Sequence, residues 1–150
     1  LKNNKLYNQN VTSYAYKIAK SKKIRVLLKR FQINFAKRDR VCIEGRDIGS
    51  VICPNADVKF FFKCDLKTRA NRRWSEYKKN NSKITLSEVK KALKIRDYSD
   101  INRKHSPLRV SKDSIVIDTS KLSKKQMLGK ISKVIDNKLL VKYGRNYKTR

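Results

Sequence analysis

Apolar residues recur along this chain at two spacings, one typical of helices and one typical of strands. From Lys22 onward the spacing is helical, with apolar residues at Ile24, Leu27, Leu28, Phe31 and Phe35. Short apolar runs at Val41–Glu44, Val58–Cys64 and Ser114–Asp118 predict three strands. The second run is almost continuously apolar at its centre, which predicts a strand covered on both faces, as in parallel sheets.

Capping signals mark where two further helices begin. Thr85 with Glu88 and Ser123 with Gln126 have the spacing of capping boxes, and each pair predicts a helix start. The residues expected to face inward are Leu86, Val89 and Leu93 in the first of these helices and Met127, Ile131, Val134, Ile135 and Leu139 in the second.

The predicted order of elements is typical of an α/β domain. A helical pattern covers Val11–Lys20, and Asp65 predicts the start of a helix that ends near Lys79, before a break at residues 80–82. Helices that separate the strands favour a parallel sheet. The length of 150 residues predicts a single domain, 1–150, with a basic tail over about 142–150.

The net charge of +28 narrows the choice of partners. A field of this strength attracts anions, which suggests nucleic acid, an acidic membrane surface or phosphorylated small molecules. The excess is mostly lysine spread along the whole chain, whereas nucleic-acid modules more often gather their cations on one stripe. Solvated lysines with no specific partner are the alternative explanation.

Three cysteines and one histidine limit metal and redox chemistry. Cys42, Cys53 and Cys64 lie in or beside apolar runs, which predicts reduced, mostly buried thiols and a cytoplasmic protein. The sequence contains no C-x-x-C pair and His105 is its only histidine, so we expect no metal site. It also contains no apolar stretch long enough to cross a membrane.

A first arginine cluster lies in the helix predicted after Asp65. Arg69, Arg72 and Arg73 share one helical face, where like charges repel each other unless an anion is bound. The planar guanidinium group binds two phosphate oxygens at once, which favours a phosphorylated ligand. A solvated helix in which Glu76 relieves the repulsion is the alternative.

A second cluster lies farther along the chain. Arg96, Asp100 and Arg103 share one face if their helix continues that far. Two cations that flank a carboxylate suit a phosphorylated sugar, because the arginines bind phosphate and the carboxylate accepts from a hydroxyl group. An ordinary salt-bridge ladder explains the spacing equally well.

The predicted strand at Val41–Glu44 runs directly into Gly45, Arg46 and Asp47. Parallel sheets present ligand-binding groups at strand ends in this way, although a charged turn is the alternative. Arg46 suits a phosphate group and Asp47 suits the amino group of a base. The chain has only 4 glycines and no glycine-rich phosphate loop. Phosphoryl transfer is compatible with these residues, since it depends on positioned cations.

These motifs, in this order, resemble bacterial cytidylate kinases from about Val11 to about Asp136. That family transfers the γ-phosphoryl group of ATP to CMP or dCMP. The matching blocks are Val11–Gln32, Glu44–Gly49 followed by Val51 and Pro54, Arg69–Arg73, Arg96–Arg103, Pro107-Leu108 and Ile117–Ser120.

The resemblance implies CMP-binding roles for six residues and catalytic roles for three. Asp47 matches the residue that reads the amino edge of cytosine, and Arg25 matches a residue that contacts the nucleotide near its base. The implied sugar-binding pair is Arg96 with Asp100, the implied phosphate ligands are Arg46 with Arg103, and the implied lid over the phosphates carries Arg69, Arg72 and Arg73.

The resemblance also implies the fold and the setting. It implies a P-loop nucleoside-monophosphate-kinase-like fold with a three-layer parallel sheet and a lid segment over about 65–105. The implied partners are CMP or dCMP and ATP with Mg²⁺, in a cytoplasmic protein that is a monomer at full length and has no membrane partner. Tyr16 departs from the family, which often has a serine near the base, and Ile101 replaces a residue that is often charged.

The family begins with a strand, a phosphate-binding loop and a CMP-binding insert that this chain does not match. We therefore expect the C-terminal portion of a cytidylate kinase, with an incomplete sheet whose central strand is missing and no activity by itself. A basic RNA-binding protein of ribosomal type is an alternative. A degraded relative that binds CMP without phosphoryl transfer is another.

Overall fold

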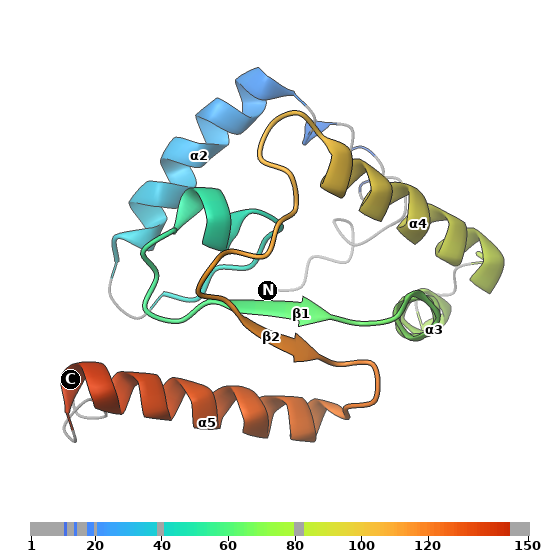
Figure 1. The fold of residues 1–150 in the computed structure, drawn as a ribbon. Helices are drawn as coiled ribbons and strands as arrows, with labels where there is room; N and C mark the ends of the chain where they lie inside the picture. Colours follow the sequence, from blue (N-terminus) through green and yellow to red (C-terminus); the bar gives the residue numbers. More distant parts are fainter. Residues whose placement is uncertain are drawn as a thin grey trace. The chain divides into compact units, whose positions relative to one another are not determined.

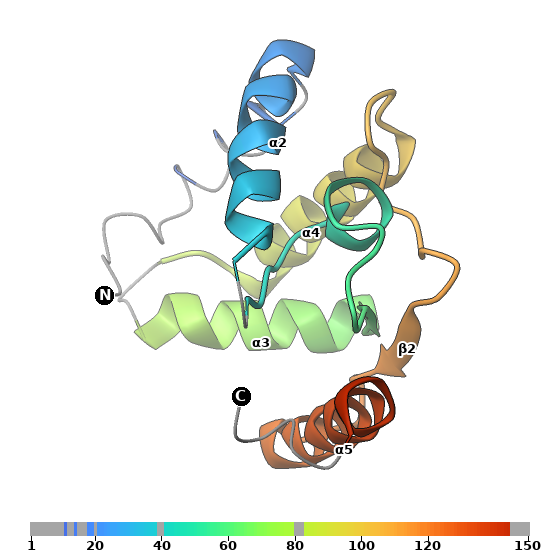
Figure 2. The same cartoon turned by 90° about the vertical axis from the view of Figure 1, so that its left-hand side faces the viewer.

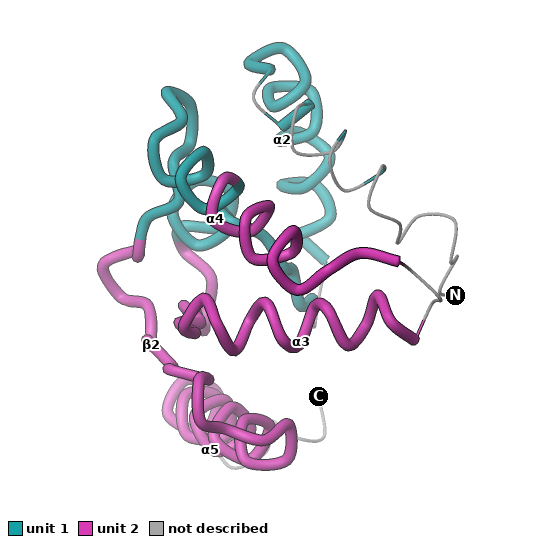
Figure 3. Tube along the Cα trace, turned by 90° about the vertical axis from the view of Figure 1, so that its right-hand side faces the viewer, with its two compact units in different colours: residues 1–54, 96–109 teal, residues 55–95, 110–150 magenta. Residues whose placement is uncertain are grey.

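The chain divides into two compact units, coloured separately in Figure 3. Unit 1 comprises Leu1–Pro54 and Arg96–Arg109, and unit 2 comprises Asn55–Ile95 and Val110–Arg150. The structure, a computed structural model, describes residues 11, 14, 18–19, 21–38, 41–79 and 83–144. The expectation of a single domain over 1–150 stays a prediction.

Unit 1 is built from helix α2, Lys22–Ala36, and from the last turns of helix α4, Leu86–Asn102. Between them along the chain lies η2, a five-residue π-helix at Ile48–Ile52 that contacts α2 (Figure 1). The sequence pattern predicts α2 correctly and misses η2. A π-helix is rare and often marks a functional site.

The strand expected at Val41–Glu44 is wrong, because residues 41–45 adopt no regular structure. A strand is stable only when its backbone groups pair with a neighbour, and no described residue forms a ladder with this segment. The occurrence of glycine at position 45 has a local explanation. A Cβ atom at this position would lie 2.6 Å from Cγ1 of Ile48. The close approach of η2 therefore requires glycine here.

The apolar face of α2 is not buried by the described chain. Its exposed residues include Leu27 at 57%, Phe31 at 65% and Phe35 at 47%. The helix forms where its pattern predicts, but the described residues leave its apolar side in contact with solvent. Exposed apolar surface of this kind usually marks a contact surface.

Unit 2 contains a parallel two-stranded sheet, with β1 at Phe60–Lys63 and β2 at Ile115–Asp118. Figure 1 shows the two strands side by side. Phe60 pairs with Ile115, and the register continues to Lys63 and Asp118. Two predicted strands and their parallel direction are confirmed. The expectation that β1 is covered on both faces is wrong: Phe62 is 49% exposed, because only two strands pair within the described chain.

Helices α3, Leu66–Lys79, and α5, Lys124–Tyr143, each follow a strand of unit 2 (Figure 1). Figure 2 shows both helices from another side. Both begin at the predicted caps. The Thr68 N–H donates to Oδ1 of Asp65 at 2.7 Å, and Ser123 forms its capping box with Gln126. Near the other end of α5, Lys142 pairs with Asp57, which precedes β1, so α5 runs back along the sheet.

The core of unit 2 lies between α3 and the first turns of α4. The indole N–H of Trp74 donates to the Ile84 carbonyl oxygen at 3.1 Å, and Thr85 and Glu88 exchange the hydrogen bonds of a capping box. Leu86 was expected to face inward but is 38% exposed, because the first turn of α4 leaves it at the surface. The buried residues of the cluster are Ala70, Tyr77, Ile84 and Val89.

Several predictions from the sequence concern residues that the structure does not describe, and one prediction about described residues is wrong. Tyr16, most of the helix predicted over residues 11–20, the break at 80–82 and the tail from residue 145 lie outside the described residues. The expectation of mostly buried thiols is wrong: Cys42 is exposed in the irregular segment before η2, and Cys53 and Cys64 are half-buried. Within the described chain, no helix combines the length and apolar character that crossing a membrane requires.

Candidate functional site

The six residues expected to bind a nucleotide all lie in unit 1, where ion pairs join them into one network. They come from three parts of the chain. Helix α2 provides Arg25, the segment before η2 provides Arg46 and Asp47, and α4 with the residue after it provides Arg96, Asp100 and Arg103. Sequence positions more than twenty residues apart therefore converge on one site.

Asp47 is a buried carboxylate held between two arginines. It is 8% exposed and forms an ion pair and hydrogen bond with Arg25. Its Oδ1 atom lies 3.5 Å from Nη2 of Arg103. A buried carboxylate is stable only when cations or hydrogen bonds compensate its charge, and both arginines do so here.

Asp100 is the second buried carboxylate, at 7% exposure. Its Oδ2 atom lies 3.4 Å from Nε of Arg46 and 3.8 Å from Nε of Arg96, and its Oδ1 atom lies 3.4 Å from Nη1 of Arg103. The helical ladder predicted from the sequence is therefore present. Arg46, from another part of the chain, joins it.

Arg103 connects the two carboxylates, although α4 ends one residue before it. Its Nε–H donates to the Ser106 carbonyl oxygen at 2.6 Å, and the Leu108 N–H donates to the Asp100 carbonyl oxygen at 2.7 Å. These bonds fold the loop after α4 back onto the helix. Burial lowers the pKa of the Arg103 guanidinium, and the positive charge of Arg25 lowers it further.

Asp97 also belongs to the network, a role that the sequence did not suggest. Its Oδ1 atom lies 3.9 Å from Nη1 of Arg46. The available signal was its position three residues before Asp100 on the same helix. With Asp97 included, four guanidinium groups face three carboxylates, which leaves one positive charge in excess.

Three buried polar atoms of the network have no hydrogen-bond partner among the described residues. They are Nε of Arg25, Nη2 of Arg103 and Oδ2 of Asp100. The last two are within ion-pair range of opposite charges, but their geometry makes no hydrogen bond. An unsatisfied buried group costs about 1–3 kcal/mol, so native proteins rarely keep several together without a ligand.

Two of the three expected lid arginines have partners close along the chain. In unit 2 the Nε–H of Arg69 donates to the Cys64 carbonyl oxygen at 3.0 Å. Arg73 pairs with Glu76 at 3.0 Å and lies over the ring of Tyr77. The ion pair expected under the alternative explanation, in which Glu76 relieves the repulsion between the arginines, is thus formed by Arg73.

Arg72 links α3 to the loop after β2. Its Nη2 donates to the carbonyl oxygens of Thr119, at 2.7 Å, and of Leu122, at 3.1 Å. No local pattern indicated these contacts, because Thr119 lies 47 residues away from Arg72. The catalytic role expected for the three arginines stays a prediction.

The carboxylates of the site form ion pairs with arginines, so they are not arranged as ligands of the expected magnesium ion. Among the described residues, no group of three or more His, Cys, Asp or Glu side chains is placed to hold a metal ion. The described residues therefore form no metal site of their own.

A parallel α/β sheet and a buried, cation-rich network with unpaired hydrogen-bond donors are typical of proteins that bind phosphorylated ligands. Comparison with known proteins narrows this class. The family model described as cytidylate kinase matches residues 1–137. The chain belongs to the cytidylate kinase family, which confirms the resemblance noted in the sequence.

Curated relatives named cytidylate kinase give the same result. The Clostridium botulinum protein is 40% identical over 130 residues, covering 87% of this chain and 58% of the relative. The Pediococcus pentosaceus protein is 37% identical over 128 residues, covering 85% and 57%, and the Thermosipho melanesiensis protein is 36% identical over 135 residues, covering 90% and 62%. The chain thus spans about three fifths of the length of these relatives.

Proposed function

We propose that this chain carries the CMP-binding part of an ATP:(d)CMP phosphotransferase. The observation that carries the proposal is the buried network of unit 1, in which two guanidinium donors and one carboxylate acceptor lack hydrogen-bond partners among the described residues. A nucleoside monophosphate offers both complements: anionic oxygens for the donors, and hydroxyl or amino groups for the acceptor.

Each residue has a place in this proposal. Asp47 accepts a hydrogen bond from the amino group of cytosine, and Arg25 holds that carboxylate in position. Asp100 accepts from a sugar hydroxyl group with Arg96 beside it. Arg46 and Arg103 bind the phosphate group of CMP.

Binding requires the network to exchange partners. Without a ligand, Arg103 pairs with both Asp47 and Asp100, and Arg46 pairs with Asp100 and Asp97. A dianionic phosphate offers these guanidinium groups a stronger acceptor than a shared carboxylate. The aspartates are then free to accept from the base and the sugar.

In the complete reaction, a phosphate oxygen of CMP attacks the γ-phosphorus of ATP, and ADP leaves. Mg²⁺, bound to ATP as part of that substrate, would neutralise part of the charge on its phosphates. Arg69, Arg72 and Arg73 are the proposed lid cations, and they must release their present partners in unit 2 to reach the phosphates. We place these residues in a P-loop nucleoside-monophosphate-kinase-like fold, in a cytoplasmic enzyme that is a monomer.

Calorimetric titration of the 150-residue chain with CMP, dCMP and AMP tests the proposal without requiring catalysis. We expect CMP to bind at least about tenfold more tightly than AMP, because adenine presents a different hydrogen-bonding edge to Asp47. Asp47→Asn should remove this preference. Equal affinity for all three nucleotides at physiological ionic strength would leave only the attraction of a chain with charge +28 for anions.

A further inference from the structure

Gly45 and Ile48 flank two residues of the network, Arg46 and Asp47, and contact each other across them. A Cβ atom on Gly45 would lie 2.6 Å from Cγ1 and 2.9 Å from Cδ1 of Ile48. Ordinary contacts between carbon atoms are about 3.5–4.0 Å long, so the Ile48 side chain lies directly against the backbone of Gly45. The chain between the two residues is therefore a short closed loop that holds Arg46 and Asp47.

The backbone of Asp47 is fixed on one side only by hydrogen bonds. Its carbonyl oxygen accepts from the N–H groups of Val51, at 2.9 Å, and of Ile52, at 3.3 Å, in the turn of η2, and Ile52 is buried. Before Asp47, residues 41–45 adopt no regular structure and form no ladder with any described residue. The contact of Ile48 with Gly45 therefore connects this irregular segment to η2, with Asp47 between them.

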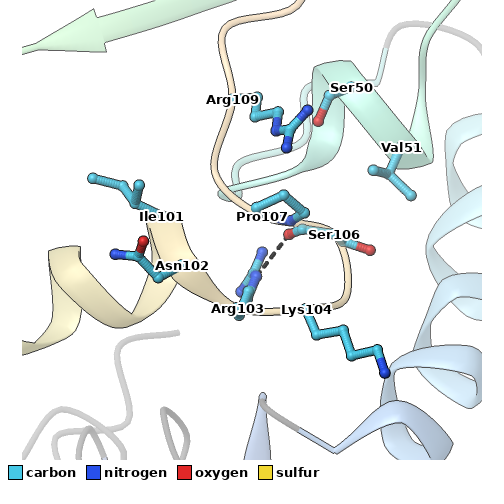
Figure 4. A pocket seen from close by; sticks show the side chains of 9 residues that line it. All are labelled: Ser50, Val51, Ile101, Asn102, Arg103, Lys104, Ser106, Pro107 and Arg109. Atoms are coloured by element: carbon cyan, nitrogen blue, oxygen red, sulfur yellow. Dashed lines mark hydrogen bonds between the residues drawn. The ribbon is translucent and has the colours of Figure 1, made fainter.

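The π-helix η2 is not packed on every side. Ser50 and Val51 line a pocket of about 690 Å³ that is also lined by the loop after α4 (Figure 4). A larger residue at position 45 can therefore displace η2, and Asp47 would move with it, because η2 begins directly after this residue. The Oδ1 atom of Asp47 lies 3.5 Å from Nη2 of Arg103, so a shift of about 1 Å is enough to weaken that ion pair.

We propose that Ile48 is a positioning residue for base recognition. Its contact with Gly45 fixes the Asp47 carboxylate in the place from which that group accepts from the amino group of cytosine. The β-branched side chain of Ile48 suits this role, because its χ1 angle is restricted and its γ carbons cannot easily swing aside. Ile48 acts through Asp47, so the role rests on the proposed function above.

The test exchanges side-chain volume between positions 45 and 48. Gly45→Ala creates a collision without a backbone penalty, because Gly45 does not have a positive φ. Ile48→Ala leaves a gap instead. Beyond its chain neighbours, the Cβ position of residue 45 has no described atom within 4 Å except the two Ile48 carbons, so G45A/I48A restores an ordinary contact. G45A/I48V is the matched control, because valine keeps both γ carbons and therefore the collision at 2.6 Å.

Calorimetry gives the ratio of the affinities for CMP and AMP in each variant. A general loss of folded protein leaves this ratio unchanged, because binding of both nucleotides would weaken equally. We expect the ratio to fall at least about fivefold in G45A and in I48A and to stay low in G45A/I48V. In G45A/I48A it should return to within about twofold of the value for the unmodified chain.

Urea unfolding gives a second measure of where Asp47 lies, and it needs no nucleotide. The shift in the urea midpoint caused by Asp47→Asn is measured in the unmodified chain and in each variant. A displaced carboxylate no longer compensates Arg25 and Arg103, so this shift should be at least halved in G45A, I48A and G45A/I48V. It should regain its full size in G45A/I48A.

The outcomes separate the role of Ile48 from the proposed function. If the unmodified chain prefers CMP and both G45A and I48A keep that preference, or if G45A/I48V recovers as fully as G45A/I48A, the role is overturned and the CMP site stands. If the unmodified chain binds CMP no better than AMP, the proposed function fails, and the urea shifts then decide the role of Ile48 alone. The expected pattern of shifts supports it, and any other pattern overturns it. Should G45A not fold, the loss in I48A and its recovery in G45A/I48A decide both comparisons.

Discussion

At the scale of single residues, the main feature of unit 1 is a set of buried charged side chains that form ion pairs with one another. Asp47 and Asp100 are the buried carboxylates, and each is compensated by arginines from separate parts of the chain. Such pairs contribute little net stability, because desolvation offsets their attraction, but removing one partner is costly. Because buried ion pairs add little to the free energy of folding, a role in ligand binding explains their presence better than a role in stability.

Replacing Asp47 with asparagine tests this directly. The substitution leaves Arg25 and Arg103 buried without their shared counter-charge, so we expect the free energy of unfolding to fall by about 3 kcal/mol. Urea unfolding followed by circular dichroism measures the change. Asp97→Asn is the control: its carboxylate is more exposed and 3.9 Å from Arg46, so it should cost less than about 1 kcal/mol. Equal effects of the two variants would contradict the central place of Asp47.

Residue types were easier to predict from the sequence than their contacts. The sequence indicated Arg96, Asp100 and Arg103 as a charged set, because helical spacing is a local property. It did not indicate that Arg46 joins Asp100 or that Arg72 reaches Thr119, since those contacts depend on how distant segments pack. Asp97 was missed for the same reason, because its contact with Arg46 joins distant segments.

At the scale of elements, helices were predicted well and strands less well. The helices α3, α4 and α5 begin at caps that the sequence shows, since a cap satisfies backbone N–H groups within a few residues. A strand depends on a partner that is distant in sequence. The run at Val41–Glu44 has strand composition but pairs with no described residue, and it remains irregular.

The capping box of α5 gives a measurable prediction at this scale. In Ser123→Ala the N–H of Gln126 loses its acceptor, so we expect the helix to lose about 1 kcal/mol. Amide hydrogen exchange in the first turns of α5 should accelerate about fivefold. The exposed Ser75, in the middle of α3, provides the control, because Ser75→Ala removes a hydroxyl group without removing a cap. Unchanged exchange in α5 of Ser123→Ala would refute the role of the cap.

At the scale of the whole molecule, the net charge of +28 and a few carboxyl groups together determine how stability depends on pH. Four exposed carboxyl groups of unit 2 have pKa values below their usual range, because each accepts hydrogen bonds in the folded state. These groups and their main donors are Asp65 with Thr68, Glu88 with Thr85, Asp113 with Lys59 and Asp118 with Ser120. A carboxyl group whose pKa falls on folding stabilises the protein above its unfolded pKa, and that contribution is lost as the pH falls through its folded pKa.

We therefore expect the thermal midpoint to stay nearly constant between about pH 7 and pH 5 and to fall below about pH 4. Protonation also adds to an already large positive charge, which acts in the same direction. Glu88→Gln keeps an acceptor for the Thr85 capping box and removes one titrating group, so its midpoint should fall less steeply. A midpoint that rises as the pH falls from 5 to 3 would contradict the assignment.

The central claim is that the charged network of unit 1 is the site that binds CMP. Nuclear magnetic resonance of the labelled chain during a CMP titration tests it most directly, because it locates the ligand whatever the catalytic competence of the chain. We predict chemical-shift changes that concentrate at Arg25, Arg46, Asp47 and residues 96–109 and that saturate with CMP. Changes spread over the lysine-rich surface without saturation, or confined to unit 2, would contradict the claim.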